Sequence, residues 1–447
     1  MQKTPAAGRR KLTVLSLAAA TYFMVSGGPY GMEDLVKDAG YKLAIVILFI
    51  TPLIWSFPTG LMVGELAAAL PAEGGFYVWV RRAMGPFWGF QEAWLSLAAS
   101  IFDMAIYPTV FVLYLGNLWP SATAGNRGFA IKLAVVTICL AWNLFGAKAV
   151  GAGSVLLGFL MLTPFVLITA FAFFRHITLG ATPPAQGNLL TGILVAMWNY
   201  MGWDNASTVA NEVENPQRTY PRVMMLTLAA IFLSYVIPVL AVWHLHVQAE
   251  TWETGSWASI ASVVVGPWLG IALVCAAMIS EFGTFNSLVM SYSRLPVAMA
   301  EDGHLPGFFT RKLSNGAPWV AIAVLGVAWA ASLGLPFDKL VMLDILLYGA
   351  SLVLEFLALI MLRIREPQLP RPFRVPGGLA GAIAVGIAPT ALLVVALVRN
   401  RSEHLDLWRF GSVSQLAFGV ALMAVGVVYY FVAGRRTSKY APVSTTK

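Results

Sequence analysis

Twelve apolar stretches dominate this chain of 447 residues, and each is long enough to cross the ~30 Å hydrocarbon core of a bilayer as a helix. They lie near residues 12–36, 41–70, 87–116, 129–147, 152–174, 189–211, 223–247, 263–290, 318–335, 340–362, 378–398 and 411–433. With 58% hydrophobic and 11% charged residues, the sequence holds too little charged surface to cover a water-soluble protein. It therefore predicts an all-α polytopic membrane protein with 12 transmembrane helices.

The distribution of positive charge predicts the orientation of the chain. An even number of crossings puts both termini on one side, and placing them inside collects 20 of the 29 Lys and Arg residues on that side. We therefore expect a multi-pass protein of the plasma or inner membrane, with cytoplasmic tails over residues 1–11 and 434–447. The net charge of +8 then reflects contact with an anionic inner leaflet, and it does not indicate nucleic-acid binding.

Two of the apolar stretches contain helix-breaking and acidic residues near mid-depth. The first is interrupted by Ser26-Gly27-Gly28-Pro29-Tyr30-Gly31-Met32-Glu33-Asp34, and the sixth by Tyr200-Met201-Gly202-Trp203-Asp204-Asn205. Irregular backbone at that depth survives only where it packs inside protein or lines a cavity. Because freed backbone groups and carboxylates bind polar solutes, this pattern points to a transporter.

The two interruptions occupy equivalent places in two halves of five helices, about residues 12–174 and 189–362. An odd number of helices per half gives the halves opposite orientations, as in inverted-repeat transporters whose site lies at the membrane midplane. The last two helices, about residues 378–433, then lie outside the repeat. Since no long linker or soluble domain intervenes, residues 12–433 are predicted to form one transmembrane domain.

Ionisable residues inside apolar stretches are functional candidates, because they are costly in a bilayer and usually face the interior of the bundle. Asp204 directly follows Trp203 at the second interruption. Its helical face is expected to continue with Ser207, Thr208 and Asn211. Such a carboxylate suits binding of a proton or a substrate cation, and the alternative is a cap on the freed N–H groups of the next half-helix.

Asp103 lies in a polar stripe of the third stretch. Ser96, Ser100 and Tyr107 share its helical face. We expect this face to line the same cavity as Asp204.

Three further acids lie in polar stripes of the eighth and tenth stretches. Glu281 borders a run of serine and threonine, and Asp344 and Glu355 share a face with Tyr348. For these three acids, an interior hydrogen bond or ion pair is as consistent with the sequence as direct contact with a substrate.

The chemistry of the first interruption favours an amine as cargo. Pro29 removes one N–H donor from the loop, and Glu33 and Asp34 add negative charge. Unwound carbonyls and half-helix C-termini also attract cations, although Gly27 and Gly28 leave room for a carboxylate. The predicted substrate is an amino acid or polyamine, with a preference for cationic amines, and a neutral amino acid permease is the alternative.

Other classes of protein leave signatures that the sequence lacks. No glycine-rich run ends in Gly-Lys-Ser or Gly-Lys-Thr, so ATP is not the energy source in this chain. There is no nucleophile elbow or zinc-protease motif, and the five histidines form no metal-ligand cluster. We therefore predict no enzyme activity, no metal and no cofactor, with a non-transporting membrane sensor as a more distant alternative.

Four motifs together resemble the amino acid, polyamine and organocation (APC) transporter superfamily over essentially the whole chain. They are Gly27-Gly28-Pro29-Tyr30-Gly31-Met32-Glu33-Asp34, then Gly64-Glu65-Leu66 with Pro71-Ala72-Glu73-Gly74-Gly75-Phe76-Tyr77-Val78-Trp79, then Gly202-Trp203-Asp204 with Glu212-Val213-Glu214-Asn215-Pro216, and Met299-Ala300-Glu301-Asp302-Gly303. The first and third motifs, with Asp103-Met104-Ala105-Ile106-Tyr107-Pro108, are similar to the plant-type polyamine uptake transporters. Leu288 and Lys148 depart from that branch and favour amino acids.

The resemblance implies a leucine-transporter-type fold, a 5+5 inverted repeat with broken helices 1 and 6, and alternating access. It implies substrate contacts from helices 1, 3, 6, 8 and 10. The candidate substrate-binding residues are Ser26, Gly27, Gly28, Tyr30, Gly31, Asp103, Tyr107, Tyr200, Gly202, Trp203, Asp204 and Glu281.

The resemblance also implies how transport is coupled. Asp204 is matched to an acid tied to proton coupling, and Lys148 to a lysine that replaces a sodium ion between helices 1 and 8. From the residues alone, Lys148 is a snorkelling lysine at a membrane boundary. We expect proton coupling or exchange, in a monomer or homodimer whose partners are the small-molecule substrate, the proton and the lipid bilayer.

Overall fold

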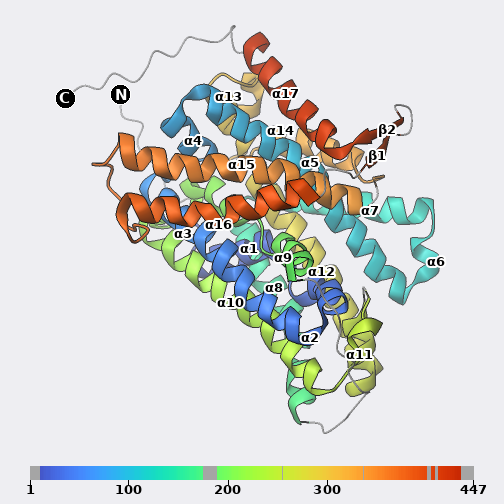
Figure 1. Ribbon diagram of the computed structural model, residues 1–447. Coiled ribbons are helices and arrows are strands. Elements are labelled where there is room, and N and C mark those ends of the chain that lie inside the picture. Colours follow the sequence, from blue (N-terminus) through green and yellow to red (C-terminus); the bar gives the residue numbers. More distant parts are fainter. Residues whose placement is uncertain are drawn as a thin grey trace.

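The computed structural model describes residues 11–174, 189–253, 255–335, 337–399, 404–407 and 411–433. Within these residues the chain is almost entirely helical, and one small antiparallel hairpin pairs β1 (His404–Leu407) with β2 (Gly411–Ser414) (Figure 1). Apart from Lys11, the two predicted tails, 1–11 and 434–447, lie outside the described residues.

Seven stretches of the described chain are long and apolar enough to cross a membrane. They are Val14–Ala69, Pro86–Leu118, Ala147–Phe174, Pro216–His244, Pro267–Glu301, Leu343–Arg365 and Gly378–Arg399. Trp319–Ala331 and Leu416–Val432 are shorter apolar helices. The prediction of a helical multi-pass membrane protein is confirmed. The count differs from the predicted one because the first stretch runs through two predicted spans and other spans are broken or short.

The first part of the chain runs up to residue 174. Its elements are α1 (Val14–Val25), the 3-10 turn η1 (Pro29–Gly31), α2 (Met32–Thr51), the π-helical turn η2 (Pro52–Ser56), α3 (Phe57–Ala69), α4 (Phe76–Met84), α5 (Pro86–Leu118), α6 (Pro120–Thr123), α7 (Asn126–Asn143) and α8 (Ala147–Phe174).

The second part begins at residue 189. Its helices are α9 (Leu189–Trp198), the 3-10 turns η3 (Trp203–Thr208) and η4 (Ala210–Glu212), α10 (Pro216–His244), the 3-10 turn η5 (Ala249–Thr251), α11 (Ser256–Val264), α12 (Pro267–Tyr292), α13 (Leu295–Glu301), the 3-10 turn η6 (Gly307–Thr310), α14 (Trp319–Ala331), α15 (Phe337–Arg365), α16 (Gly378–Arg399) and α17 (Gln415–Ala433).

The first predicted interruption is present. α1 starts at a capping box in which Thr13 and Ser16 satisfy each other's backbone N–H groups. It ends where Ser26 turns extended, and Gly28 takes a positive φ of 77° before the chain becomes helical again in η1 and α2. A second positive φ, 69° at Gly40, divides α2 into two helical pieces joined by a kink.

The second predicted interruption is present as well, but its far side differs from the expectation. α9 ends at Trp198, and Gly202 takes a left-handed φ of 94°. Beyond it the chain forms the tighter 3-10 turns η3 and η4 instead of an α-helix. The predicted α-helical face shared by Asp204, Ser207, Thr208 and Asn211 is therefore wrong, because a 3-10 helix turns every three residues.

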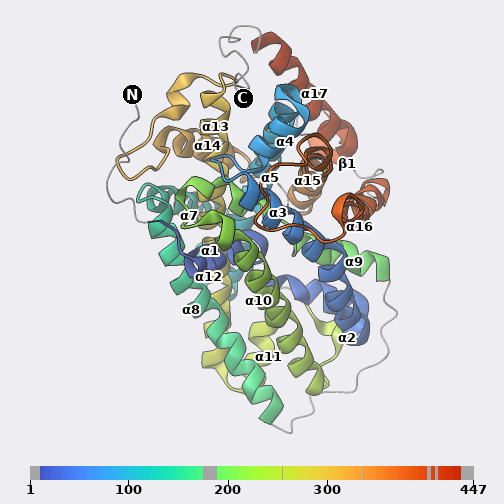
Figure 2. The same cartoon turned by 90° about the vertical axis from the view of Figure 1, so that its left-hand side faces the viewer.

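The broken segments lie inside the bundle. α1 packs against α8, α10 and α12, while α5 packs against α12 and α15. Figure 2 shows α1 surrounded by α8, α10 and α12, and α16 and α17 at the edge of the bundle. In both views α4 and α13 lie at the end opposite α11 (Figures 1 and 2). We call the end that holds α4 and α13 the α4 end.

Candidate functional site

The first break is held open by side chains from neighbouring helices. Ser26 lies in extended backbone, and its Oγ accepts the Gly28 N–H at 3.0 Å while it bonds the Tyr235 hydroxyl at 2.6 Å. Ser280 on α12 donates to the Gly27 carbonyl at 2.5 Å. Freed backbone groups are therefore satisfied inside the protein, as a bilayer requires.

The second break is tied to the first through one phenol. Tyr235 on α10 donates to the Asn199 carbonyl at 2.9 Å, while its oxygen contacts Ser26 Oγ. Trp55 donates its indole N–H to the Tyr200 carbonyl at 3.0 Å. The two interruptions, far apart in the sequence, are thus neighbours in space.

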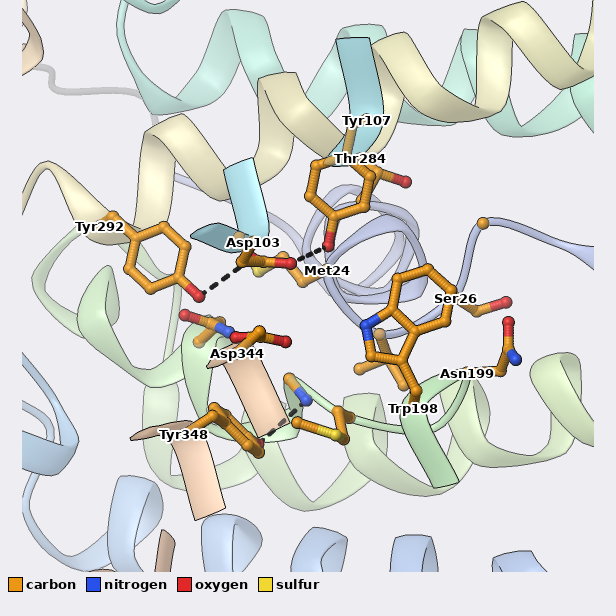
Figure 3. A pocket seen from close by; sticks show the side chains of 15 residues that line it. Met24, Ser26, Asp103, Tyr107, Trp198, Asn199, Thr284, Tyr292, Asp344 and Tyr348 are labelled. Atoms are coloured by element: carbon orange, nitrogen blue, oxygen red, sulfur yellow. Dashed lines mark hydrogen bonds between the residues drawn. The ribbon is translucent and has the colours of Figure 1, made fainter. Parts of the chain in front are cut away.

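A cavity of about 50 Å³ lies between the two breaks. Its walls come from α1, α5, α9, α12, α15 and the two breaks (Figure 3). The lining residues are Met24, Val25, Ser26, Gly27, Asp103, Tyr107, Trp198, Asn199, Met201, Gly202, Asn205, Thr284, Tyr292, Asp344 and Tyr348. This volume holds a few water molecules, so side chains must move apart before a di- or triamine can bind.

Two carboxylates from different helices face this cavity. Asp103 on α5 receives hydrogen bonds from Tyr107 at 2.5 Å and from Tyr292 at 3.2 Å. Asp344 on α15 lies on the same side of the cavity, with Trp198 across from it (Figure 3). No lysine or arginine is among the described residues that line the cavity. Since buried charges are stable only when paired, a cationic group is the natural counterpart of this pair.

Asp204 lies one layer behind the cavity wall. It is buried, and its Oδ1 accepts a 2.5 Å hydrogen bond from the Tyr348 hydroxyl. The Tyr348 oxygen in turn accepts the Gly202 N–H at 3.0 Å and faces the cavity. Tyr348 therefore separates Asp204 from the cavity.

The structure brings only part of the predicted substrate-binding set to the cavity. Ser26, Gly27, Asp103, Tyr107 and Gly202 line it. The other predicted residues, Gly28, Tyr30, Gly31, Tyr200, Trp203, Asp204 and Glu281, are not in its lining. These seven lie in the layer around the cavity or farther along the broken helices.

Several of these residues have structural contacts of their own. The Tyr30 hydroxyl donates to the Leu273 carbonyl at 2.7 Å, and its ring packs edge-on against Phe165. The Tyr200 ring packs edge-on against Tyr235. Glu281 lies beside Gly27, since a Cβ on that glycine would be 3.6 Å from its Oε1. Glu281 is therefore close to the first break without lining the cavity.

Glu33 was expected to add negative charge near a substrate. In the structure its carboxylate is instead occupied by hydrogen-bond donors of the protein. Its carboxylate accepts the backbone N–H groups of Gly255 and Trp257 at the start of α11, and the Tyr114 hydroxyl at 3.1 Å. N–H groups at a helix start stabilise an anion. Glu33 thus fastens the far half of the first broken helix to α11, a contact between segments that no local pattern reveals.

Lys148, which the resemblance places between helices 1 and 8, has few contacts in the structure. It lies exposed in the first turn of α8, and it makes no hydrogen bond or ion pair with the described residues. Between α1 and α12, the contact to the first break comes from the neutral Ser280. The geometry therefore agrees with a lysine at a membrane boundary.

Sequence reasoning missed several lining residues. Trp198 and Asn199 directly precede the second break, and Thr284 and Tyr292 come from α12. Trp198 could have been predicted to line the cavity, because it lies next to the second break in the sequence. For Tyr292 the sequence carried none, because its direction depends on how α12 is rotated against α5.

Buried acids around a cavity between two broken helices, in a chain with several membrane-length helices, define a membrane transport protein of the permease class rather than an enzyme. A family model described as amino acid permease matches residues 12–405. The chain belongs to this family, and its resemblance to the APC superfamily is confirmed.

Relatives with assigned names agree with this membership. The chain is 36% identical to the polyamine transporter RMV1 of Arabidopsis thaliana over 87% of its length and 80% of that protein. It is 34% identical to the polyamine transporter PUT1 of Oryza sativa subsp. japonica, over 87% of its length and 74% of that protein. The serine/threonine exchanger SteT of Bacillus subtilis is 27% identical over 71% of this chain and 74% of that protein. Similarity to plant polyamine transporters, predicted from the motifs, is confirmed.

Proposed function

We propose that this permease carries polyamines or other small cationic amines across the membrane by alternating access. The observation that carries the proposal is the pair Asp103 and Asp344, two buried carboxylates that face one cavity without a lysine or arginine in its described lining. An ammonium group supplies the missing positive charge, and Tyr107, Tyr292 and Tyr348 supply oxygen atoms and ring faces around it. Amino acids are the alternative cargo.

The architecture proposed for this function has twelve crossings in a 5+5 inverted repeat. Support comes from the paired breaks after α1 and after α9, each with a glycine at positive φ, and from the position of α16 and α17 at the edge of the bundle. We place the α4 end in the cytoplasm, with both termini, because Arg81, Arg82, Arg363 and Arg365 gather there.

Coupling to protons is proposed to act through Asp204 and Tyr348. While Asp204 is ionised, the phenol donates to it, one lone pair of the phenol oxygen accepts the Gly202 N–H, and the other lone pair is available to a cation in the cavity. A protonated Asp204 can donate to Tyr348 instead, and the phenol hydrogen then turns toward the cavity, where it repels an ammonium group. Amine binding therefore favours loss of the proton from Asp204. Lys148 has no part in this step, since it is exposed on α8.

Uptake into proteoliposomes tests the proposal. Labelled putrescine, spermidine, arginine and alanine are supplied with and without a pH gradient, and with sodium replaced by choline. We expect faster uptake of the amines than of alanine, stimulation by external acid, and no requirement for sodium. Preference for alanine would make the chain a neutral amino acid permease, and absence of any transport would favour a sensor.

A further inference from the structure

A second pair of buried acids lies behind the cavity, and neither acid has a role in substrate contact. Glu92 on α5 and Glu355 on α15 are both fully buried. Glu92 Oε1 accepts from Ser96 at 2.9 Å. Among the described residues, Glu92 Oε2 and both oxygens of Glu355 have no hydrogen-bond partner. Buried carboxyl groups without hydrogen-bond partners lower the stability of the folded protein, so they are candidates for a functional role.

The spacing of the acids along the two helices is the same. Glu92 precedes Asp103, and Glu355 follows Asp344, by about three helical turns in each case, so each pair shares a helix face. α5 and α15 pack against each other. They run antiparallel, because Arg365 at the end of α15 donates at 2.8 Å to the carbonyl of Ala83 in α4, just before α5 begins. Glu92 and Glu355 therefore lie at similar depth, between the cavity and the α4 end.

Asp204 lies within electrostatic range of both Glu92 and Glu355, and so connects this pair of acids to the cavity wall. The groups that act electrostatically on Glu355 are Asp204 from η3, Glu92 from α5 and Tyr348 from its own helix. Asp204, Glu355 and Tyr77 interact electrostatically with Glu92, Ser96 donates a hydrogen bond to it, and none of these groups is a cation. Ion pairing thus explains neither acid within the described chain.

The path continues from Glu92 to the surface. Tyr77 on α4 lies within electrostatic range of Glu92. The Tyr77 hydroxyl donates to Asp302 Oδ2 at 2.6 Å, and the Asp302 side chain is 26% exposed at the α4 end, where it pairs with Arg81. Tyr77 and Asp302 therefore lie between Glu92 and the exposed surface of the α4 end.

We propose that Glu355 and Glu92 relay a proton between Asp204 and the α4 end of the bundle. The inference rests on the proposed function, in which amine binding expels the proton of Asp204. As Asp204 releases it, Glu355 accepts that proton and passes its own to Glu92, which passes one to water at the α4 end. The number of protons on the relay is unchanged, and one proton moves inward with the amine. Without the relay, the proton released by Asp204 would return to the cavity. With the relay, it leaves toward the α4 end.

Two assays on the full-length protein in proteoliposomes separate the relay from substrate binding. One measures putrescine accumulation driven by external acid, with a pH-sensitive dye inside, and the other measures putrescine–putrescine exchange at equal pH. We expect Glu355→Gln and Glu92→Gln to lower accumulation and dye response at least about tenfold, since a proton cannot pass an amide, while exchange stays within about twofold of wild type. Glu214→Gln, at an exposed acid, is the matched control and should retain both activities.

The outcomes are distinct. Full accumulation by both glutamine variants overturns the relay alone, and failure of the wild type to transport putrescine at all overturns the proposed function with it. A selective loss of spermidine affinity with intact coupling would assign the acids to substrate binding and also overturn the relay. If a glutamine variant fails to insert, the relay is tested instead by infrared difference spectra recorded with and without putrescine. Putrescine is expected to change a carboxylic-acid C=O band of the wild type that shifts in Glu355→Asp, and a spectrum without that band contradicts the relay.

Discussion

The Tyr348 hydroxyl donates a 2.5 Å hydrogen bond to Asp204, and this contact connects an acid outside the cavity lining to the wall of the cavity. Sequence reasoning placed Asp204 in the substrate site itself. In the structure Asp204 lies behind the cavity wall, and the phenol of Tyr348 lies between Asp204 and the cavity. In the proposed mechanism, a proton on Asp204 and an amine in the cavity compete because the direction of the Tyr348 hydroxyl hydrogen depends on the charge of Asp204.

Asp204→Asn should abolish putrescine accumulation driven by a pH gradient while the protein still inserts and binds putrescine. The amide fills the same space, but it cannot exchange a proton. Uptake into proteoliposomes with and without external acid gives the measurement, and binding is followed separately by thermal stabilisation. Unchanged accumulation would refute the coupling role of Asp204.

Tyr348→Phe should weaken coupling while Asp204 remains present. The ring still packs in α15, but the hydroxyl that joins Asp204 to the cavity is lost, and so is the acceptor for the Gly202 N–H. We expect the stimulation of putrescine uptake by external acid to fall severalfold, with a smaller change in uptake at equal pH. Equal losses under both conditions would show that Tyr348 serves only to bind or to pack.

Asp103→Asn should weaken binding of cationic substrates more than that of neutral ones. A hydrogen bond to a charged group contributes about 1.5–3 kcal/mol, so we expect the KM for putrescine to rise roughly 10- to 100-fold. The KM for alanine, if it is transported, should change much less. Competition assays with putrescine and alanine measure both, and similar losses for the two compounds would count against cation recognition by Asp103.

Both breaks could be predicted because their causes are local. Gly28 and Gly202 adopt positive φ, which only glycine tolerates easily, and Pro29 limits hydrogen bonding beside the first. Helical periodicity also placed Asp103 and Tyr107 on one face, and they do hydrogen-bond. These features depend on neighbours within a turn or two of helix.

The remaining features depend on contacts between distant segments. The sequence could not show that the carboxylate of Glu33 accepts hydrogen bonds from the start of α11, or that the side chain of Lys148 is exposed. Nor could it show that η3 is a 3-10 helix, because a short polar segment inside protein follows its surroundings more than its propensity. The direction of Tyr292 likewise follows from the packing of α12 on α5.

Gly202→Ala should disrupt the second break. Gly202 has a φ of 94°, and a Cβ at this position would overlap the carbonyl oxygen of Met24, in the last turn of α1 just before the first break. The strained backbone alone costs on the order of 1–3 kcal/mol, and the overlap with a backbone atom adds to it. We expect a lower Tm and little transport. Gly334→Ala, where a Cβ would meet nothing within 4 Å, serves as the control. Normal transport by Gly202→Ala would contradict this close approach of the two breaks.

Two acids at the α4 end should differ sharply in their contribution to stability. Glu65 is fully buried and holds Arg363 at 2.5 Å and Arg371 at 3.1 Å. Glu65→Gln leaves these guanidinium groups without their counter-charge, and breaking a buried pair costs about 3–5 kcal/mol. We expect a clear fall in Tm in detergent.

Glu366→Gln is the matched comparison, because Glu366 pairs with Arg82 at 2.6 Å where both side chains are partly exposed. The hydrogen bond from Arg82 lowers the pKa of Glu366 below its ordinary value of 4.5. The pair therefore stabilises the folded protein above that pH, and this contribution disappears as the pH falls through the lowered value. Because water screens the pair, its loss should cost about 0–1 kcal/mol. Melting curves of both variants at pH 7 decide the matter, and an equal fall in Tm for Glu65→Gln and Glu366→Gln would contradict the burial of Glu65.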